Sequence, residues 1–316
     1  MLIRITPILS WVIFVVYAYN DISENRWELC LVLFAALSIV PKGMWLIGHE
    51  RPWWYWVLVA GLYLGFWYYP SEASVWLAMP YLCYAAWFAL WEISNLVVYK
   101  IYKLERWVRA AAYAYWAVGA AWAVLFLADA SPFGFSPTIV GLTSAHFHYA
   151  GFVLAVLVLC MLEDMRCVFT EILGVGILVG MPIVAAGITF TKLGYSPIYE
   201  SVFASLFVLL VLGITGHLIY LIFQKRHLRD ARKLWVVAAG AMLFSMAMAG
   251  TYALRSFWPD HEWTYIPKMI TWHGTINATL FSWLILRSWT YVKRWQMDEY
   301  RKDWKLFDPD DPLRYY

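Results

Sequence analysis

The stretch Val202–Phe223, VFASLFVLLVLGITGHLIYLIF, decides what kind of protein this is. It runs for 22 residues without a charged side chain, and its only histidine is His217. An α-helix of about 20 consecutive apolar residues crosses the hydrocarbon core of a bilayer. This stretch is therefore predicted to be a membrane-spanning helix.

The rest of the chain has the same character. Hydrophobic residues make up 63% of the 316 positions and charged residues only 14%, whereas a typical soluble domain has about 25% charged residues. So few charges could not cover a water-soluble globule, which excludes a soluble enzyme, a disordered protein and a nucleic-acid-binding protein. We predict an all-α, polytopic membrane bundle of about ten transmembrane helices. The predicted spans are Ile5–Tyr19, Trp27–Val40, Trp53–Tyr69, Val75–Val98, Trp107–Ala130, Ser144–Glu163, Glu171–Phe190, Val202–Phe223, Leu234–Phe257 and Pro267–Trp289.

The distribution of basic residues predicts the orientation. With the N-terminus inside, the inner segments hold 20 of the 24 Lys and Arg residues, and the outer ones hold only Arg26, Lys192, Arg255 and Lys268. Because Lys and Arg concentrate in cytoplasmic loops, both termini are expected in the cytoplasm of a bacterial cell, with the bundle in its inner membrane. Pro41 is expected to end the second span early, because proline removes a backbone donor within a helix.

The chain is predicted to fold as one unit. Residues 1–292 are expected to form a single transmembrane bundle, and residues 293–316 a polar cytoplasmic tail. The first apolar run has no small-residue cleavage site, so no cleavable signal peptide is expected. No CxxC pair occurs, which argues against a disulfide framework and a zinc ribbon. The cysteines are Cys30, Cys83, Cys160 and Cys167.

One cluster of polar residues is predicted in the outer half of the bundle. His146 and His148 open the sixth span, and His273 and Asn277 enter the tenth span at a similar depth. Ionisable groups inside a bilayer are costly and mark functional sites, so we expect these side chains to converge; a structural hydrogen-bond network is the alternative. Residues 146 and 148 point in nearly opposite directions, about 200° apart around a helix, which weakens a simple zinc site. Glu200, at the outer start of the eighth span, is a further candidate.

A looser group lies near the predicted inner face. Glu92 and His217 are candidate catalytic residues there, because apolar surroundings make both side chains costly. Glu163, Asp164 and Glu171 are interpreted as ion-pair or helix-terminus acids. The histidines in loops are expected to be solvated: His49, His227 and His261.

Aromatic residues make up 19% of the chain. Some belong to interfacial belts. Others lie in the middle of spans, where they either pack in the core or line a cavity for an apolar or cationic ligand. These mid-span residues are Trp87, Trp91, Tyr113, Tyr115, Trp116 and Trp122.

Two segments carry a family resemblance. HFHYAGF (His146–Phe152) and HGTINA (His273–Ala278) resemble the YndJ-like family of bacterial multi-pass membrane proteins, in which a similar HFHYAGF and a later HGxxNA occur in the same order. The resemblance covers these segments and the spans between them. It implies a membrane bundle with a His/Asn site, and it implies no reaction.

A second resemblance is local. AHFHY (Ala145–Tyr149) is similar to the helix of heme-copper oxidase subunit I in which two histidines bind two hemes on opposite sides. HGT (His273–Thr275) resembles an early helix of that subunit that supplies another heme ligand. The two motifs stand in the reverse order here, and the copper-binding segment has no counterpart.

Three functions follow from these observations. The first is a membrane enzyme that cyclises or isomerises a hydrophobic, lipid-like substrate such as an isoprenoid or polyketide. His146 or His148, together with His273, would move protons, because the ordinary pKa of histidine lies near working pH. Asn277 and Tyr149 would orient the substrate or stabilise developing charge.

The second function is that of a redox protein with heme or a transition metal as cofactor, bound by His146, His148 and His273. The third is a transporter with polar groups at both faces, although no inverted repeat is evident. The expected partners are the lipid bilayer and a hydrophobic small-molecule substrate, with no nucleic acid. The substrate, the reaction and the oligomeric state are left open.

Overall fold

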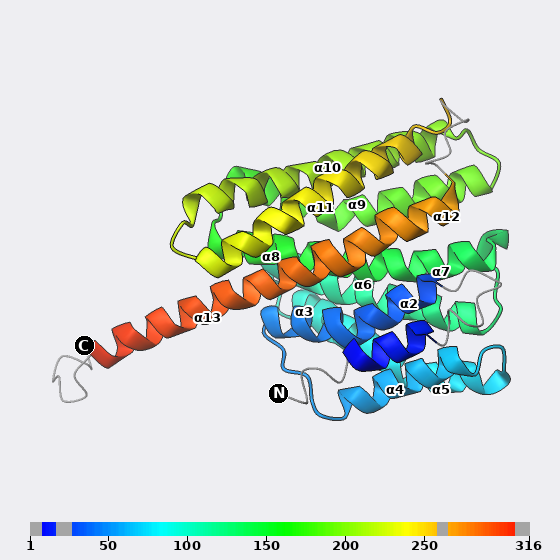
Figure 1. Cartoon of the computed structure of the whole chain (residues 1–316), viewed down its shortest axis with the longest axis horizontal. Coiled ribbons are helices and arrows are strands. Elements are labelled where there is room, and N and C mark those ends of the chain that lie inside the picture. Colours follow the sequence, from blue (N-terminus) through cyan, green and yellow to red (C-terminus); the bar gives the residue numbers. More distant parts are fainter. Residues whose placement is uncertain (1–7, 17–26, 258–264, 307–316) are drawn as a thin grey trace.

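The computed structural model describes residues 8–16, 27–257 and 265–306 (Figure 1), and every regular element in these ranges is helical. A short helix covers residues 8–16. The elements that follow are α2 (Trp27–Phe34), η1 (Ala35–Ile39), α3 (Val40–Leu46), α4 (Tyr55–Trp67), α5 (Glu72–Val98), α6 (Leu104–Leu127), η2 (Pro132–Gly134), α7 (Pro137–His146), η3 (Phe147–Val153), α8 (Leu154–Asp164), α9 (Val168–Lys192), α10 (Ile198–Gln224), α11 (Arg229–Ala253), α12 (Ile266–Lys268), η5 (Met269–Gly274), η6 (Ile276–Ser282) and α13 (Trp283–Leu306).

Seven helices in the described ranges are long and apolar enough to cross a membrane, which makes the chain a multi-pass membrane protein. They are Trp27–Leu46, Glu72–Val98, Leu104–Leu127, Pro137–Asp164, Val168–Lys192, Ile198–Gln224 and Arg229–Ala253. The all-helical membrane fold expected from composition is thus confirmed. The count of ten spans and the orientation of the termini stay predictions. The ends of the predicted span Ile5–Tyr19, and His261, lie outside the described residues.

The long helices lie side by side (Figure 1), with α4 and α5 along one edge and α9, α10 and α11 along the opposite edge. Between them, α6 contacts α5, α7, η3, α8 and α9. Among the seven candidate spans, the continuous helical rods 27–46 and 137–164 are the most buried. In contrast, α5, α9 and α10 turn large apolar side chains outward. Such outward apolar faces suit contact with lipid, and the buried rods carry the polar residues of interest.

The prediction that Pro41 ends the second helix is wrong. The helix continues through Pro41 as far as Leu46, because the turn before the proline is a π-helix. There the Val40 backbone N–H donates to the Ala35 carbonyl, five residues back. The wider turn accommodates the proline inside a continuous rod.

The missing N–H of Pro41 leaves the Ala36 carbonyl, five residues before it, without its partner in the π-helical register. The Tyr55 hydroxyl donates to this carbonyl at 2.7 Å. A tyrosine of α4 thereby satisfies a backbone group that a proline has freed, as buried carbonyls require.

Pro182 in the middle of α9 repeats the arrangement. Proline cannot donate to the Leu178 carbonyl, four residues back. The Tyr115 hydroxyl of α6 lies 2.9 Å from that oxygen and 2.8 Å from the Ile177 carbonyl oxygen. Tyr115, predicted either to pack or to line a cavity, thus contacts the backbone of α9.

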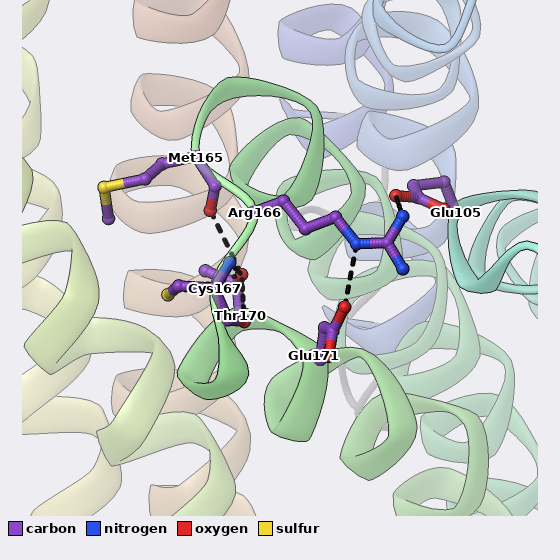
Figure 2. Close-up of polar contacts among 6 residues, drawn as sticks. All are labelled: Glu105, Met165, Arg166, Cys167, Thr170 and Glu171. Atoms are coloured by element: carbon purple, nitrogen blue, oxygen red, sulfur yellow. Dashed lines mark hydrogen bonds and ion pairs between the residues drawn. The ribbon is translucent and has the colours of Figure 1, made fainter.

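The turn between α8 and α9 carries ion pairs (Figure 2). Arg166 donates from Nε to Glu171 at 2.8 Å and from Nη1 to Glu105 at 2.9 Å. Cys167 begins α9 as a cap, and its backbone N–H donates to the Thr170 hydroxyl at 2.9 Å. These contacts fix the loop, but exposed ion pairs contribute only about 0–1 kcal/mol each.

The acids that end α8 pair with basic residues of other helices. Asp164 receives a hydrogen bond from Lys225 at 2.7 Å, and Glu163 lies 3.6 Å from Arg109. The predicted ion-pair role of both acids is therefore observed.

The C-terminal helix α13 runs through residue 292 without a break, so the predicted division between bundle and tail falls inside a helix. Its far end extends beyond the other helices (Figure 1). The Lys293 ammonium donates to the Leu46 carbonyl at 2.5 Å, and the Gln296 amide donates to Asp164 at 3.4 Å. These contacts attach the first turns of the predicted tail to the bundle.

Candidate functional site

His146 and His273 lie beside each other in the predicted outer half of the bundle. Their ring centroids are 6.5 Å apart and the rings are inclined by 26°, which is a stacked arrangement. His146 ends α7 and His273 lies in η5, so two distant parts of the sequence supply the pair. The side chain of His146 is exposed and that of His273 half-buried. The His146 ring can therefore be reached by another molecule.

Hydrogen bonds fix the tautomer of both rings. Nδ1 of His146 lies 2.8 Å from the Leu142 carbonyl oxygen, and Nδ1 of His273 lies 3.0 Å from that of Ser245. A carbonyl oxygen only accepts, so each Nδ1 carries the proton and donates it. Nε2 is therefore the nitrogen that carries the lone pair in both neutral rings.

Asn277 completes the pair. Its side-chain amide lies 3.2 Å from Nε2 of His273 and donates to it. Its Oδ1 is buried and has no hydrogen-bond partner among the residues that the structure describes. The Ser245 hydroxyl, 2.9 Å from Nδ1, holds the other edge of the His273 ring. An unpaired buried oxygen is costly, so Oδ1 is suited to accept a hydrogen bond from a bound molecule.

His148 faces the other way. It is fully buried, its Nδ1 donates to the Ser144 carbonyl at 2.8 Å, and Nε2 lies 3.4 Å from the Tyr81 hydroxyl. The Trp116 indole donates to the same hydroxyl at 2.8 Å. A Cβ on Gly119 would lie 2.6 Å from Nδ1 of His148, so the backbone of α6 closes over the ring. His148 therefore lies apart from the His146–His273 pair.

Tyr149 is also outside this pair. Its hydroxyl donates to the Leu31 carbonyl at 2.7 Å and so connects η3 with α2. A second contact between α2 and the His273 segment runs from the Trp27 indole to the Thr275 hydroxyl at 2.7 Å. Together they hold the two histidine-bearing rods against α2.

Wide helical turns gather at the same place. In the described part of the chain, π-helical turns occur in η1, η3, η5 and η6. η3 touches both η1 and η6. His146 directly precedes η3, His273 lies in η5 and Asn277 in η6. Such turns are frequent at functional sites, because they re-aim side chains at a cost in helix stability.

The polar residues predicted near the inner face do not form one site. Glu92 lies 3.7 Å from His49 and 3.9 Å from Arg106. His217 packs against the rings of Phe169, centroids 6.0 Å apart, and Tyr220. The two candidates thus have separate partners on different helices.

The expectation that His49 is solvated is wrong. Its side chain is 27% exposed, Nδ1 lies 2.6 Å from the Tyr113 hydroxyl, and its ring packs on Phe88. Burial lowers the pKa of His49, and the nearby Glu92 carboxylate opposes that shift. His227 does keep its exposure and stacks on Trp295. Loop position alone therefore does not tell whether a histidine is solvated.

Glu200 does not join the histidines. It accepts a hydrogen bond from Arg255 at 2.6 Å, which joins the first turn of α10 to the segment after α11. A buried carboxylate beside a guanidinium is satisfied by that pair. This suggestion from the sequence is therefore corrected.

No group of three metal-ligating side chains gathers within the described residues. His146 and His273 supply two nitrogens on one side of α7, whereas His148 points to the other. A three-histidine site made of His146, His148 and His273 does not fit this geometry.

The model of the YndJ-like family matches residues 30–281, which include His146 and His273. The chain belongs to the YndJ-like family. No curated protein and no solved structure matches it. The family resemblance expected from the sequence is thus confirmed, whereas the local likeness to an oxidase helix gains no support.

Several residues of this YndJ-like protein's site could not be named from the sequence. Ser245 lies among small residues of α11, and Tyr81 and Trp116 are two of many mid-span aromatics. Glu28 is buried on α2, where a Cβ on Gly141 would lie 2.6 Å from its Cγ. A carboxylate inside the apolar run WELCLVLF was the only signal for Glu28.

Proposed function

We propose that the chain is an integral membrane enzyme that performs acid/base chemistry on a hydrophobic, lipid-like substrate. His146 and His273 would transfer the protons and Asn277 would bind a polar group of the substrate. The stacked histidine pair carries the proposal, because both rings are held in one tautomer and one of them is accessible.

The chemistry follows from the lone pairs on Nε2. A neutral imidazole removes a proton, and the resulting imidazolium returns one. Two adjacent rings avoid being charged together, because like charges repel at this separation. One ring thus serves as base while the other stays neutral or acts as acid, which is what an isomerisation or a proton-initiated cyclisation requires.

The surroundings favour an apolar substrate. Trp272 and Leu280, on the helix that carries His273, are 50% and 45% exposed. In a bilayer these side chains face acyl chains, so a hydrophobic molecule could approach from the side. The unpaired Oδ1 of Asn277 would accept a hydrogen bond from a substrate hydroxyl. An isoprenoid or a polyketide with one polar end meets these requirements.

The test compares lipid extracts of cells that produce the wild-type chain, His146→Gln, His273→Gln or His227→Gln at equal levels in the membrane. His227, an exposed histidine stacked on Trp295, is the matched control. We expect a hydrophobic compound that depends on the wild type and the control and is lost with either site variant. Extracts that are identical for all four proteins would overturn the proposal.

Metal or heme binding is the second candidate, favoured by one observation. Histidine ligands of metals donate their other ring N–H to a backbone carbonyl or carboxylate, and His146 and His273 both do so. Metal analysis and an absorption spectrum of the purified protein test this. A bound metal or heme that His146→Ala abolishes would support it, and a colourless, metal-free protein would exclude it.

A further inference from the structure

Positively charged side chains gather along the contact between α3 and α13, near the predicted inner ends of both helices. The two helices touch each other there (Figure 1), far from the His146–His273 pair in the predicted outer half. Each helix also places one tryptophan among the cations. We call this group the basic seam. Its members are Lys42 and Trp45 of α3 and Trp283, Arg287, Lys293 and Arg294 of α13.

The Trp283 indole borders the first two cations of the basic seam. The Lys42 ammonium lies 5.8 Å from the centroid of this ring, and the Arg287 guanidinium lies 5.3 Å from it. One indole thus holds a cation from each of the two helices. A cation near an indole is attracted by the ring electrons, but the ring carries no net charge that could balance the two cations.

The Trp45 indole borders the other two cations. The Lys293 ammonium lies 5.8 Å from the centroid of this ring, and the Arg294 guanidinium lies 5.9 Å from it. Arg287 and Arg294 are seven residues apart, which is about 10 Å along α13. Positive charge therefore follows the basic seam for about two helical turns.

The cations of the basic seam lack an acidic partner. Within the described residues, none of the four forms an ion pair. The Lys42 ammonium donates to the Ser38 carbonyl at 2.9 Å, and the Arg287 guanidinium donates to the Tyr291 hydroxyl at 3.2 Å. Because an ammonium has three N–H donors and a guanidinium five, these contacts leave several donors for a bound anion.

The depth of the basic seam indicates where such an anion comes from. Lys42 lies inside the membrane-spanning rod 27–46, and Arg287 precedes the predicted end of the last span at Trp289. Arg287 is exposed and Lys42 is half-buried. Near the end of a span, an exposed side chain contacts lipid, and long basic side chains extend toward the headgroups. A soluble anion would have to enter the membrane to reach this level, whereas a lipid phosphate is already there.

We propose that the basic seam binds the phosphate headgroup of an anionic phospholipid such as phosphatidylglycerol. Lys42 and Arg287 donate hydrogen bonds to the phosphate, and the planar guanidinium matches two of its oxygens. Lys293 and Arg294 lie farther toward the predicted cytoplasm and attract the negative headgroup. A zwitterionic lipid fits less well, because these cations repel its ammonium group. The proposal does not depend on the proposed enzyme function.

The experiment measures lipid binding to the full-length chain by native mass spectrometry in detergent. The protein is mixed with equal amounts of phosphatidylglycerol and phosphatidylcholine that carry the same acyl chains. A basic side chain near an anionic surface contributes about 1 kcal/mol, which is about fivefold in affinity. Two direct contacts should therefore give about 25-fold stronger binding of phosphatidylglycerol. The double variant Lys42→Gln/Arg287→Gln should abolish this preference.

The matched control is the double variant Lys103→Gln/Arg226→Gln. It removes the same two charges from exposed positions outside the basic seam, in the loops before α6 and α11. Its preference for phosphatidylglycerol should equal that of the wild type. Equal binding of the two lipids by the wild type would overturn the proposal, and so would an equal loss of preference in the two double variants.

A single substitution and a competitor complete the test. If Lys42→Gln/Arg287→Gln does not fold, Arg287→Gln alone changes an exposed residue and should lower the preference about fivefold. An unchanged preference in this variant would contradict the assignment. An excess of inorganic phosphate should leave the phosphatidylglycerol bound. If inorganic phosphate displaces it, the basic seam is a site for a soluble anion and the proposal of a lipid is wrong.

Discussion

His146 and His148 are two residues apart on one helical rod, yet their surroundings are opposite. Both donate Nδ1–H to the carbonyl four residues before them. His148 is sealed by α6, and its Nε2 is occupied by Tyr81, whereas His146 is exposed and stacks on His273. The backbone therefore sets the same tautomer for both rings, and the neighbouring helices determine which lone pair remains available for chemistry.

The largest expected difference between the two histidines is in catalytic activity. His146→Gln should lower formation of the product by about 10²–10⁴-fold, the usual contribution of a general acid or base. His148→Gln should leave the activity of folded protein within about tenfold of wild type by the same measure. The assay is product per amount of protein recovered in the membrane. An equal loss in the two variants would show that the sealed histidine takes part in the reaction.

Substituting Gly119 tests how closely α6 packs against the His148 ring. A Cβ at this position would lie 2.6 Å from Nδ1 of His148, so Gly119→Ala should destabilise the protein by about 1–3 kcal/mol through overpacking. Gly240→Ala is the matched control, because within the described residues a Cβ there would meet no side chain and no neighbouring helix within 4 Å. Alanine also favours a helix by up to about 1 kcal/mol. Thermal unfolding in detergent measures both. Equal midpoints would mean that the ring has room to move.

A smaller loss of stability is expected at the contact between η3, which follows His146, and α2. Tyr149→Phe leaves the Leu31 carbonyl without the hydroxyl that donates to it, which should cost about 0.5–1.5 kcal/mol. Tyr68→Phe, at a 58% exposed residue, should cost nothing measurable. Denaturation midpoints of the two variants would differ, unless water replaces the lost donor.

The smallest effect concerns a third kind of histidine environment, that of His49. Because its folded pKa is lowered by burial, the unfolded chain binds this proton first as the pH falls through about 6.5. Stability from this group is therefore present above that pH and is lost below it. Unfolding midpoints at about pH 7.5 and 5.5 should fall less in His49→Gln than in the wild type. A wild type that gains stability on acidification would contradict the sign.

The sequence predicted the general fold and part of the site for identifiable reasons. Long apolar runs fix the length of helices such as α10, and the spacing of His146 and His148 predicts that they point apart. Their depth at the start of two spans also placed His146 near His273. These inferences need only helix geometry and the thickness of a bilayer.

Other features depend on packing that one sequence does not reveal. Pro41 does not end its helix, because the π-helical turn before it accommodates the proline ring. The Tyr55 hydroxyl then donates to the Ala36 carbonyl that the proline leaves without a partner. Glu200 has Arg255 as a partner, which no local pattern indicates. Choosing Tyr81 among 22 tyrosines requires knowing which helix lies next to η3.

The unbroken path of α13 through residue 292 has a practical consequence for engineering. The helix is about 36 Å long, so a fluorescent reporter or affinity tag fused behind it would be held away from the other helices by a rigid rod. Cutting the chain after residue 292, where the polar composition invites truncation, would remove both Lys293 and Gln296 and with them their contacts to Leu46 and Asp164. A shortened chain for crystallisation or cryo-electron microscopy should therefore end beyond Gln296.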